Sequence, residues 1–416
     1  PKHARQALAH TLAWLDHPVF GVAPEAQFVL HAFLKRQDPG PEHGPRAIAR
    51  AFAWLGHGDN ALSWEAGFVL PPLLDRQDFP PLQARGAITC ALTWLQVRIR
   101  DYPRDALYVV GPLLKRQEMD AEQAAQAMEH ALVLLAHDEV AHSPDASFTL
   151  QALLRRGELD RSRARRAAEI TLQWLRHEQH STSRQAAFVL PALLEQMSVP
   201  SGLMAQAVNL SLVWLEVHAG SVDAEFVLKA LLLRSDIDGP SRQRLQLFAL
   251  GRVTHLLETE NANEASFLLQ ACLRDRRMDS GLDAPLIRSA LVWISRYHDH
   301  ADAQYVFNRL LRKHEVEDED WKQVARVASD WLATHALTDE IDFTINSLLV
   351  RAYLLTPAQL GLVLQKGLNW ILNSSVSAHA RRMLLSKLVY AADGTEFAAN
   401  MNEIASKWLP QVRQDV

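Results

Sequence analysis

Four histidines recur at one position of an internal repeat, and imidazole is the side chain best suited to metal binding or to a switch near neutral pH. His17, His57, His137 and His177 each stand three residues after the first residue of a Trp-Leu or Leu-Leu pair. Equivalent helices in stacked repeats lie about 8–10 Å apart, whereas the ligands of one zinc ion lie about 2 Å from it. A ladder of shared metal sites is therefore disfavoured. We interpret the column as imidazoles near the negative C-terminal ends of helices, and we expect no metal.

A column of arginines would suit a different chemistry, the binding of phosphate groups. Arg36, Arg76, Arg116 and Arg156 recur every 40 residues. Each is followed two residues later by an acid, namely Asp38, Asp78, Glu118 and Glu158. The acids favour charge pairing at repeat junctions, worth at most about 1 kcal/mol per pair at an exposed surface. We predict a structural role for this column.

No group of residues indicates a catalytic site. The phosphate-binding GxxxxGK[ST] loop, GxGxxG, HExxH and GxSxG are all absent from the sequence. Its two cysteines, Cys90 and Cys272, stand in apolar helical patterns, which is typical of small buried residues. We expect a protein that is not an enzyme and that needs no cofactor.

Composition narrows the class of protein further. The 416 residues carry a net charge of −5. A protein with this charge lacks the positive electrostatic field of a general nucleic-acid or membrane-surface binder. No apolar run is long enough to span a membrane, and cysteines without CxxC spacing favour a reducing cytoplasm. Because the sequence opens on Pro1, we expect more chain before it, such as an N-terminal effector domain that is fused to it or assembled with it.

Two aromatic columns define the repeat. The first is a Trp-Leu pair, in which the tryptophans are Trp14, Trp54, Trp94, Trp174, Trp214, Trp293 and Trp331, with Trp370 and Trp408 in looser surroundings and Leu134 and Leu256 in the two gaps. The second column consists of Phe28, Phe68, Tyr108, Phe148, Phe188, Phe226, Phe267, Tyr305 and Phe343. We predict that both columns are buried in the core, and we do not interpret the second as a platform for stacking bases.

Each repeat contains two helical patterns. The first is typified by ARQALAHTLAWL at 4–15, and the second runs A-x-F-V-L-x-x-L-L after helix-start residues such as Pro24-Glu25. One such pair cannot bury its apolar faces alone, but stacked pairs can. The sequence predicts an all-α fold, a right-handed α-solenoid of about ten two-helix repeats of about 40 residues. We expect regular repeats over 1–280 (about seven), diverged repeats over 281–355, and a terminal repeat with a C-terminal capping helix over 356–416.

An Ala/Trp-Leu first helix and an Ala-x-Phe second helix resemble those of tetratricopeptide-type solenoids, although that family repeats about every 34 residues and carries a W-x2-L-G-x2-Y signature absent here. The phrase WL…H…A-x-FVL-x-x-LL-x-R-x-D is also similar to the repeat arrays that follow the nucleotide-binding core in bacterial STAND-type NTPase defence proteins. That resemblance implies a sensor region that recognises a foreign protein while another domain acts.

The polar side of the first helices varies between repeats while the core columns do not, which is typical of a binding surface on a regular frame. The candidate partner-binding residues are Arg46, Arg50, Arg85, His130, Arg165 and Arg166. We expect a phage or host protein to bind in the concavity, with neither a membrane nor nucleic acid as partner. The alternatives are a stand-alone adaptor or scaffold, and a helical-repeat nucleic-acid reader or enzyme.

Overall fold

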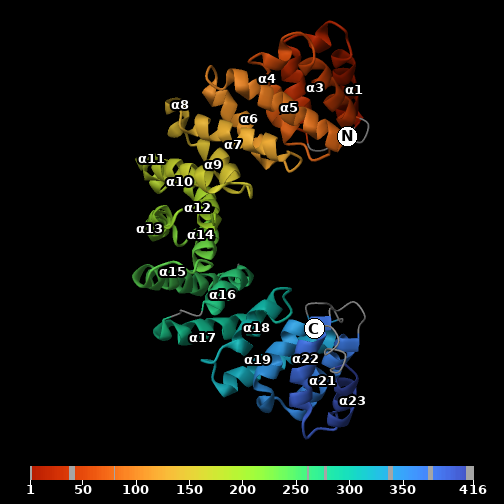
Figure 1. The fold of residues 1–416 in the computed structure, drawn as a ribbon, viewed down its shortest axis with the longest axis vertical. Coiled ribbons are helices and arrows are strands. Elements are labelled where there is room, and N and C mark those ends of the chain that lie inside the picture. Colours follow the sequence, from red (N-terminus) through yellow and green to blue (C-terminus); the bar gives the residue numbers. More distant parts are fainter. Residues whose placement is uncertain are drawn as a thin grey trace. The chain divides into compact units, whose positions relative to one another are not determined.

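The computed structural model describes residues 2–36, 43–78, 80–259, 262–275, 279–335, 341–372 and 378–408. Within these ranges every regular element is a helix, and consecutive helices form pairs (Figure 1). The prediction of an all-helical array of two-helix repeats is confirmed, and its handedness stays a prediction. The chain divides into two compact units, unit 1 (Pro1–Val217) and unit 2 (His218–Val416). None of the described helices combines the length and the apolar character needed to cross a bilayer.

Unit 1 holds five repeats and the first helix of a sixth. Its first helices are α1 (Lys2–Leu15), α3 (His43–Leu55), α5 (Pro81–Arg98), α7 (Ala121–Leu135), α10 (Arg161–Arg176) and α13 (Ser201–His218). Its second helices are α2 (Ala26–Leu34), α4 (Ala66–Leu74), α6 (Pro103–Lys115), α9 (Ala146–Leu154) and α12 (Ala186–Glu195). Short helical turns between them are η1 (Phe20–Val22), η2 (Asn60–Leu62), α8 (Asp138–Ala141) and α11 (Glu178–Ser181).

Unit 2 continues the same alternation. Its first helices are α15 (Gly239–Leu257), α17 (Ser280–Tyr297), α19 (Asp318–Thr334) and α21 (Pro357–Leu372). Its second helices are α14 (Ala224–Leu232), α16 (Ala265–Arg274), α18 (Ala303–Arg312), α20 (Ile341–Leu348) and α22 (Ala378–Ala392), followed by α23 (Ala398–Trp408). Two 3₁₀ turns are η3 (Ala262–Glu264) and η4 (Leu349–Leu354). The described part of the chain thus holds the predicted ten or so pairs and a final half-repeat, while the predicted divisions at 280 and 355 stay predictions.

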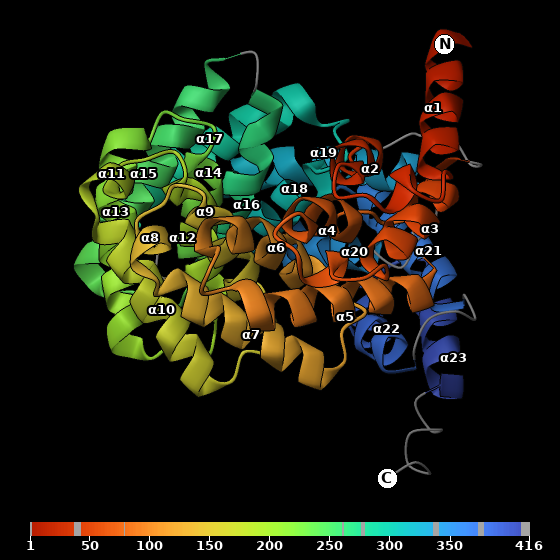
Figure 2. The same ribbon diagram turned by 90° about the horizontal axis from the view of Figure 1, so that it is seen from above.

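Each unit has two helix layers. In unit 1 the second helices pack on one another in the order α2, α4, α6, α9 and α12, and they do so more extensively than the first helices. Small residues make this close approach possible, because Ala26, Ala66, Ala146 and Ala186 begin second helices and are fully buried. Figure 2 shows the second helices of unit 1 on the inner side of its curve and the first helices on the outer side. The inner layer is therefore made of second helices, whereas the sequence had suggested the first.

Polar residues set the starts of several first helices. The Asp120 carboxylate accepts from the Gln123 backbone N–H at 2.9 Å, and the Gln123 side chain accepts from the Asp120 N–H at 3.2 Å. Asp160 accepts from the N–H of Arg163 at 2.8 Å in the same way. Each cap satisfies a backbone donor that lacks a partner inside the helix, which stabilises the helix by about 1 kcal/mol.

Most of the tryptophan column lies in the core, as predicted, whereas Trp14 and Trp331 are only half-buried. The indoles of Trp54, Trp94, Trp174 and Trp214 in unit 1 and of Trp293 in unit 2 are at most 1% exposed. Their Nε1–H groups donate to a carbonyl 31 residues earlier at 2.7–2.9 Å, namely those of Ala23, Ser63, Ser143, Ser183 and Ala262. Each indole therefore joins a first helix to the loop of the preceding repeat. The side chain of Trp408 lies outside the described residues.

Candidate functional site

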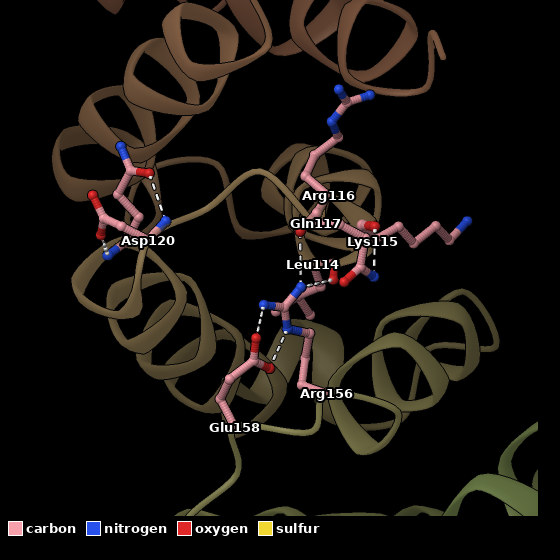
Figure 3. A network of polar contacts seen from close by, with 8 residues as sticks. Leu114, Lys115, Arg116, Gln117, Asp120, Arg156 and Glu158 are labelled. Atoms are coloured by element: carbon pink, nitrogen blue, oxygen red, sulfur yellow. Dashed lines mark hydrogen bonds and ion pairs between the residues drawn. The ribbon is translucent and has the colours of Figure 1, made fainter. Parts of the chain in front are cut away.

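The arginine column is a buried chain of hydrogen bonds at the C-terminal ends of the second helices. Arg156 Nη1 donates to the carbonyls of Leu114 and Arg116 at 3.2 and 2.8 Å, while its Nε and Nη2 donate to Glu158 at 3.0 and 2.6 Å (Figure 3). Arg116 and Arg76 make the equivalent contacts in the two preceding repeats.

The predicted pairing with acids is thus confirmed for Arg76, Arg116 and Arg156, but its setting is buried. The fourth predicted pair, Arg36 with Asp38, involves a residue outside the described ranges. Arg76, Arg116 and Arg156 are only 4–7% exposed. Each guanidinium extends inward to donate to carbonyls at the end of the preceding second helix, which have no donor inside their own helix. These side chains hold successive second helices together.

The second aromatic column is exposed, which corrects the prediction that it belongs to the core. Its exposed fractions in unit 1 are Phe28 68%, Phe68 40%, Tyr108 55%, Phe148 56% and Phe188 42%. In unit 2 they are Phe226 62%, Phe267 52%, Tyr305 44% and Phe343 56%. We call these nine residues the aromatic ladder. Exposed aromatic side chains that recur along a row of packed helices make this face a candidate binding surface.

Helix geometry explains why the rings face outward. In α9 the residues Ala146, Leu150 and Leu153 are buried against the core. Phe148, Gln151 and Arg155 follow one another at intervals of three and four residues, so they share the opposite face. In α9 the ladder ring is therefore the first residue of a stripe on the outward face that continues with Gln151 and ends on the basic Arg155.

In several repeats the side chain at the variable position, three residues after the ring, contacts the next repeat. His31 Nδ1 lies 2.8 Å from the Phe68 carbonyl oxygen, to which it donates when protonated at that nitrogen, and Gln151 Nε2 donates to the Phe188 carbonyl at 3.0 Å. In unit 2 the Lys229 ammonium lies 4.2 Å from the centre of the Phe267 ring. This position is occupied by His31, Pro71, Gly111, Gln151, Pro191, Lys229, Gln270, Asn308 and Asn346. Side chains that differ in hydrogen bonding thus alternate with the rings.

A groove separates two neighbouring ladder residues of unit 1. It has a volume of about 350 Å³, and Tyr108, Gly111, Pro112 and Phe148 are among its lining residues. The Tyr108 hydroxyl donates to Asp145 at 2.9 Å, and this bond, with burial second, raises the pKa of Tyr108 above its usual value. The hydroxyl therefore stays protonated near neutral pH, and its hydrogen bond connects the phenol to the start of α9.

The predicted partner-binding residues lie on the first-helix layer. Arg46 and Arg50 both pair with Asp16, at 2.7 and 2.5 Å. Arg165 pairs with Glu169 at 2.9 Å and Arg166 with Glu129 at 2.8 Å.

The other two predicted residues differ from these. Arg85 is exposed on α5, and burial lowers the pKa of the half-buried His130. These six side chains lie on first helices while the ladder rings lie on second helices, and their role in binding stays a prediction.

One member of the histidine column, His177, packs at a repeat junction beside two histidines outside the column, His142 and His180. The rings of His142 and His177 stack with centres 4.5 Å apart, and His180 stacks on Trp174 at 4.2 Å. His180 Nε2 donates to the His142 carbonyl at 2.9 Å. Among the described residues no group of three or more His, Cys, Asp or Glu side chains is arranged to hold a metal ion.

The cysteines are poor candidates for chemistry. Burial raises the pKa of Cys272 to about 12 and also raises that of Cys90. Because the thiolate is the reactive form, a thiol with so high a pKa is a weak nucleophile near neutral pH.

Comparisons with known proteins give only distant similarities. The chain matches no protein-family model and no curated protein. It is similar to the crystal structure of the RNA-binding domain of yeast Puf5p bound to MFA2 RNA, with 11% identity and a TM-score of 0.32 over 92% of this chain and 98% of that one. The same domain bound to SMX2 RNA gives 12% identity and a TM-score of 0.33 over the same shares.

Both of these structures hold RNA. This finding runs against our expectations that the partner is a protein and that nucleic acid is not bound, and we withdraw both. At such TM-scores the likeness carries no argument of its own for this chain. What replaces those expectations must come from the aromatic ladder.

Proposed function

We propose that this chain is a non-enzymatic reader of single-stranded nucleic acid that stacks one base on each ring of the aromatic ladder. The observation that supports the proposal is the exposure of an aromatic ring at the same position of nine second helices. Base–aromatic stacking contributes about 1–3 kcal/mol per base, and it accepts every base because each has a π-face.

The spacing of the rings suits an unstacked strand. Neighbouring packed helices lie about 8–10 Å apart, more than twice the roughly 3.4 Å between stacked bases in a duplex. Bases placed on successive rings therefore cannot stack on one another. Single strands can splay their bases apart in this way, and a duplex cannot.

The variable position gives the ladder a means of telling bases apart. Gln151 lies between Phe148 and Phe188 and can both donate and accept hydrogen bonds, whereas Pro191 of the next repeat can do neither with its side chain. Repeats that carry a polar residue here would read base edges, and repeats that carry proline or glycine would tolerate any base.

The net charge shapes the expected affinity. With −5 overall, the protein gains little from long-range attraction to phosphates, so stacking must supply most of the binding free energy. The basic residues seven positions after a ring, Lys35, Lys115 and Arg155 in unit 1, provide local contacts to a few phosphates. The affinity should therefore fall less steeply with salt than it does for a strongly basic protein.

The test starts with selection of binding sequences from random single-stranded RNA and DNA pools. The affinity of the selected strands is then measured by fluorescence anisotropy. The double variant Phe148→Ala/Phe188→Ala should lose at least about 30-fold in affinity. Its melting temperature should stay close to that of the original protein, because both rings are exposed.

A matched control removes exposed apolar groups from the other layer. Leu82 and Val133 lie on first helices and are 81% and 46% exposed, so Leu82→Ala/Val133→Ala should bind as the original protein does. Equal binding by the Phe148→Ala/Phe188→Ala variant, or no binding of either kind of strand by the original protein, would overturn the proposal.

Two finer inferences from the sequence belong here as proposals. The similarity to repeat arrays of STAND-type proteins concerns the array alone, and no protein ligand is carried over with it. A reducing cytoplasm is the proposed setting, on the strength of two unpaired cysteines.

A further inference from the structure

Three arginines line a pocket of unit 2. Arg274 is the last residue of α16, and Arg309 and Arg312 lie in the last turn of α18. Together with Lys313 and His314 they are among the residues that line a pocket of about 570 Å³. Several arginines that line one space make it a candidate site for an anion.

Unlike the buried arginines of unit 1, these three have no acidic partner among the described residues. Arg312 donates to neutral acceptors, the Ser347 hydroxyl at 2.8 Å and the Phe343 carbonyl at 3.2 Å. Arg274 and Arg309 have no ion pair with any residue in the described part of unit 2.

The acids of the pocket are occupied by other bases. Asp275 pairs with Arg242 at 2.9 Å, and both side chains are at most 7% exposed. Lys313 pairs with Asp283 and lies 3.8 Å from Glu315. The pocket therefore keeps an excess of positive charge.

The pKa of one arginine reflects that excess. Burial, followed by repulsion from the charges of Arg274 and Arg312, lowers the pKa of Arg309 below its usual value. An anion placed among the three guanidinium groups would relieve this repulsion.

The pocket lies on the same face as the aromatic ladder. Arg274 stands seven residues after Phe267, and Arg312 stands seven residues after Tyr305. Residues at that spacing share one side of a helix. Arg312 also donates to the backbone of Phe343, the next ladder residue.

We propose that this pocket binds a phosphate group of the strand whose bases stack on Phe267, Tyr305 and Phe343, an inference that rests on the proposed function. Guanidinium groups stay charged and present a planar fork that matches phosphate oxygens. The pocket would fix the register of the strand along unit 2, and the variable residues of the ladder would then meet defined bases.

The test uses Arg274→Gln/Arg309→Gln in the full chain, with Arg312 kept because it also bonds to Ser347 and Phe343. Arg288→Gln is the control, since Arg288 is exposed on the first helix α17 and lies outside the residues that line the pocket. Anisotropy with a selected strand is measured from about 50 to 200 mM KCl. We expect the double variant to lose about tenfold in affinity and its salt slope to fall by about 0.7 for one lost phosphate contact, while the control changes neither.

The outcomes separate the two proposals. If the strand binds the original protein but the double variant keeps its affinity and salt slope, the pocket inference is wrong and the ladder stands. If no strand binds the original protein, the proposed function fails and the strand assignment fails with it. In that case the melting temperature is compared in potassium phosphate and in KCl of equal ionic strength. A melting temperature that is higher in phosphate for the original protein and the control, but not for the double variant, would show that the pocket binds free phosphate.

Discussion

The guanidinium of Arg156 donates to the backbone carbonyl of Arg116, 2.8 Å away and 40 residues earlier in the chain. Arg116 makes the same bond to the carbonyl of Arg76. Each arginine therefore supplies the donor that the preceding second helix lacks at its C-terminal end. A buried side chain that must reach one repeat back tolerates little change in repeat length, which accounts for the strict 40-residue period of this region.

Removal of Arg156 should destabilise unit 1 strongly. Arg156→Ala leaves two carbonyls without their donor and Glu158 without its partner, and breaking a buried ion pair costs about 3–5 kcal/mol. Because the Glu158 side chain is 50% exposed, the lower end of that range is expected. Urea denaturation measures the loss. Arg155→Ala removes an exposed arginine from the adjacent position and should change the free energy of unfolding by no more than about 0.5 kcal/mol.

The indole of Trp174 should contribute both packing and one hydrogen bond. Trp174→Ala should lower the free energy of unfolding of unit 1 by about 3–5 kcal/mol. Trp174→Phe keeps an aromatic ring but leaves the Ser143 carbonyl without a donor, so it should show part of that loss. Thermal melting of both variants checks the order, and an unchanged melting temperature for Trp174→Ala would contradict the assigned core.

Unit 1 should lose stability as the pH falls below neutrality. Burial lowers the pKa of His180, against the weaker effect of its bond to His142, and the charges of His177 and His142 lower it further. The unfolded chain therefore binds more protons than the folded one below about pH 6.5, and the free energy of unfolding falls as the pH drops through the folded pKa. His180→Gln should flatten this fall. The exposed His57 serves as the control, and a flattening of the same size in His57→Gln would refute the assignment.

Charge reversal on the first helices should leave strand binding intact. Arg46 and Arg50 pair with Asp16 at a partly exposed surface, so Arg46→Glu/Arg50→Glu should cost at most about 1 kcal/mol per lost pair. Since both residues lie on the outer layer of unit 1, affinity for a selected strand should change less than in Phe148→Ala/Phe188→Ala. A larger loss of affinity than in Phe148→Ala/Phe188→Ala would show that the strand binds to the first helices.

The repeat and its tryptophan column could be predicted from the sequence because they depend on apolar residues at constant intervals. That the rings of the second aromatic column face outward could not be predicted. The second helices are apolar on nearly every side, so Phe148 in ASFTLQALL is not marked as a surface residue by contrast with its neighbours. The signal that identifies its face is the polar pair Gln151 and Arg155, three and seven residues after the ring.

The burial of the arginine column also could not be predicted from the residues that neighbour each arginine in the sequence. The acid two residues after each arginine predicts the ion pair, but the carbonyls that draw the side chain inward belong to the preceding repeat. The pocket of Arg274, Arg309 and Arg312 depends on two helices in the same way. Its sequence signal, basic residues four and seven positions after a ladder ring, becomes informative only once the ring is known to be exposed.

The leucine that replaces tryptophan in α7 bears on how unit 1 responds to mechanical force. Leu134 has no indole N–H, and Pro103, 31 residues earlier, is already the first residue of α6. The third and fourth repeats are therefore joined without the indole bond that crosses the other junctions of unit 1. Under tension applied to the two ends of unit 1, this junction would be held by packing and by bonds such as those of Tyr108 to Asp145 and of Arg156 to the Arg116 carbonyl, without an indole bond.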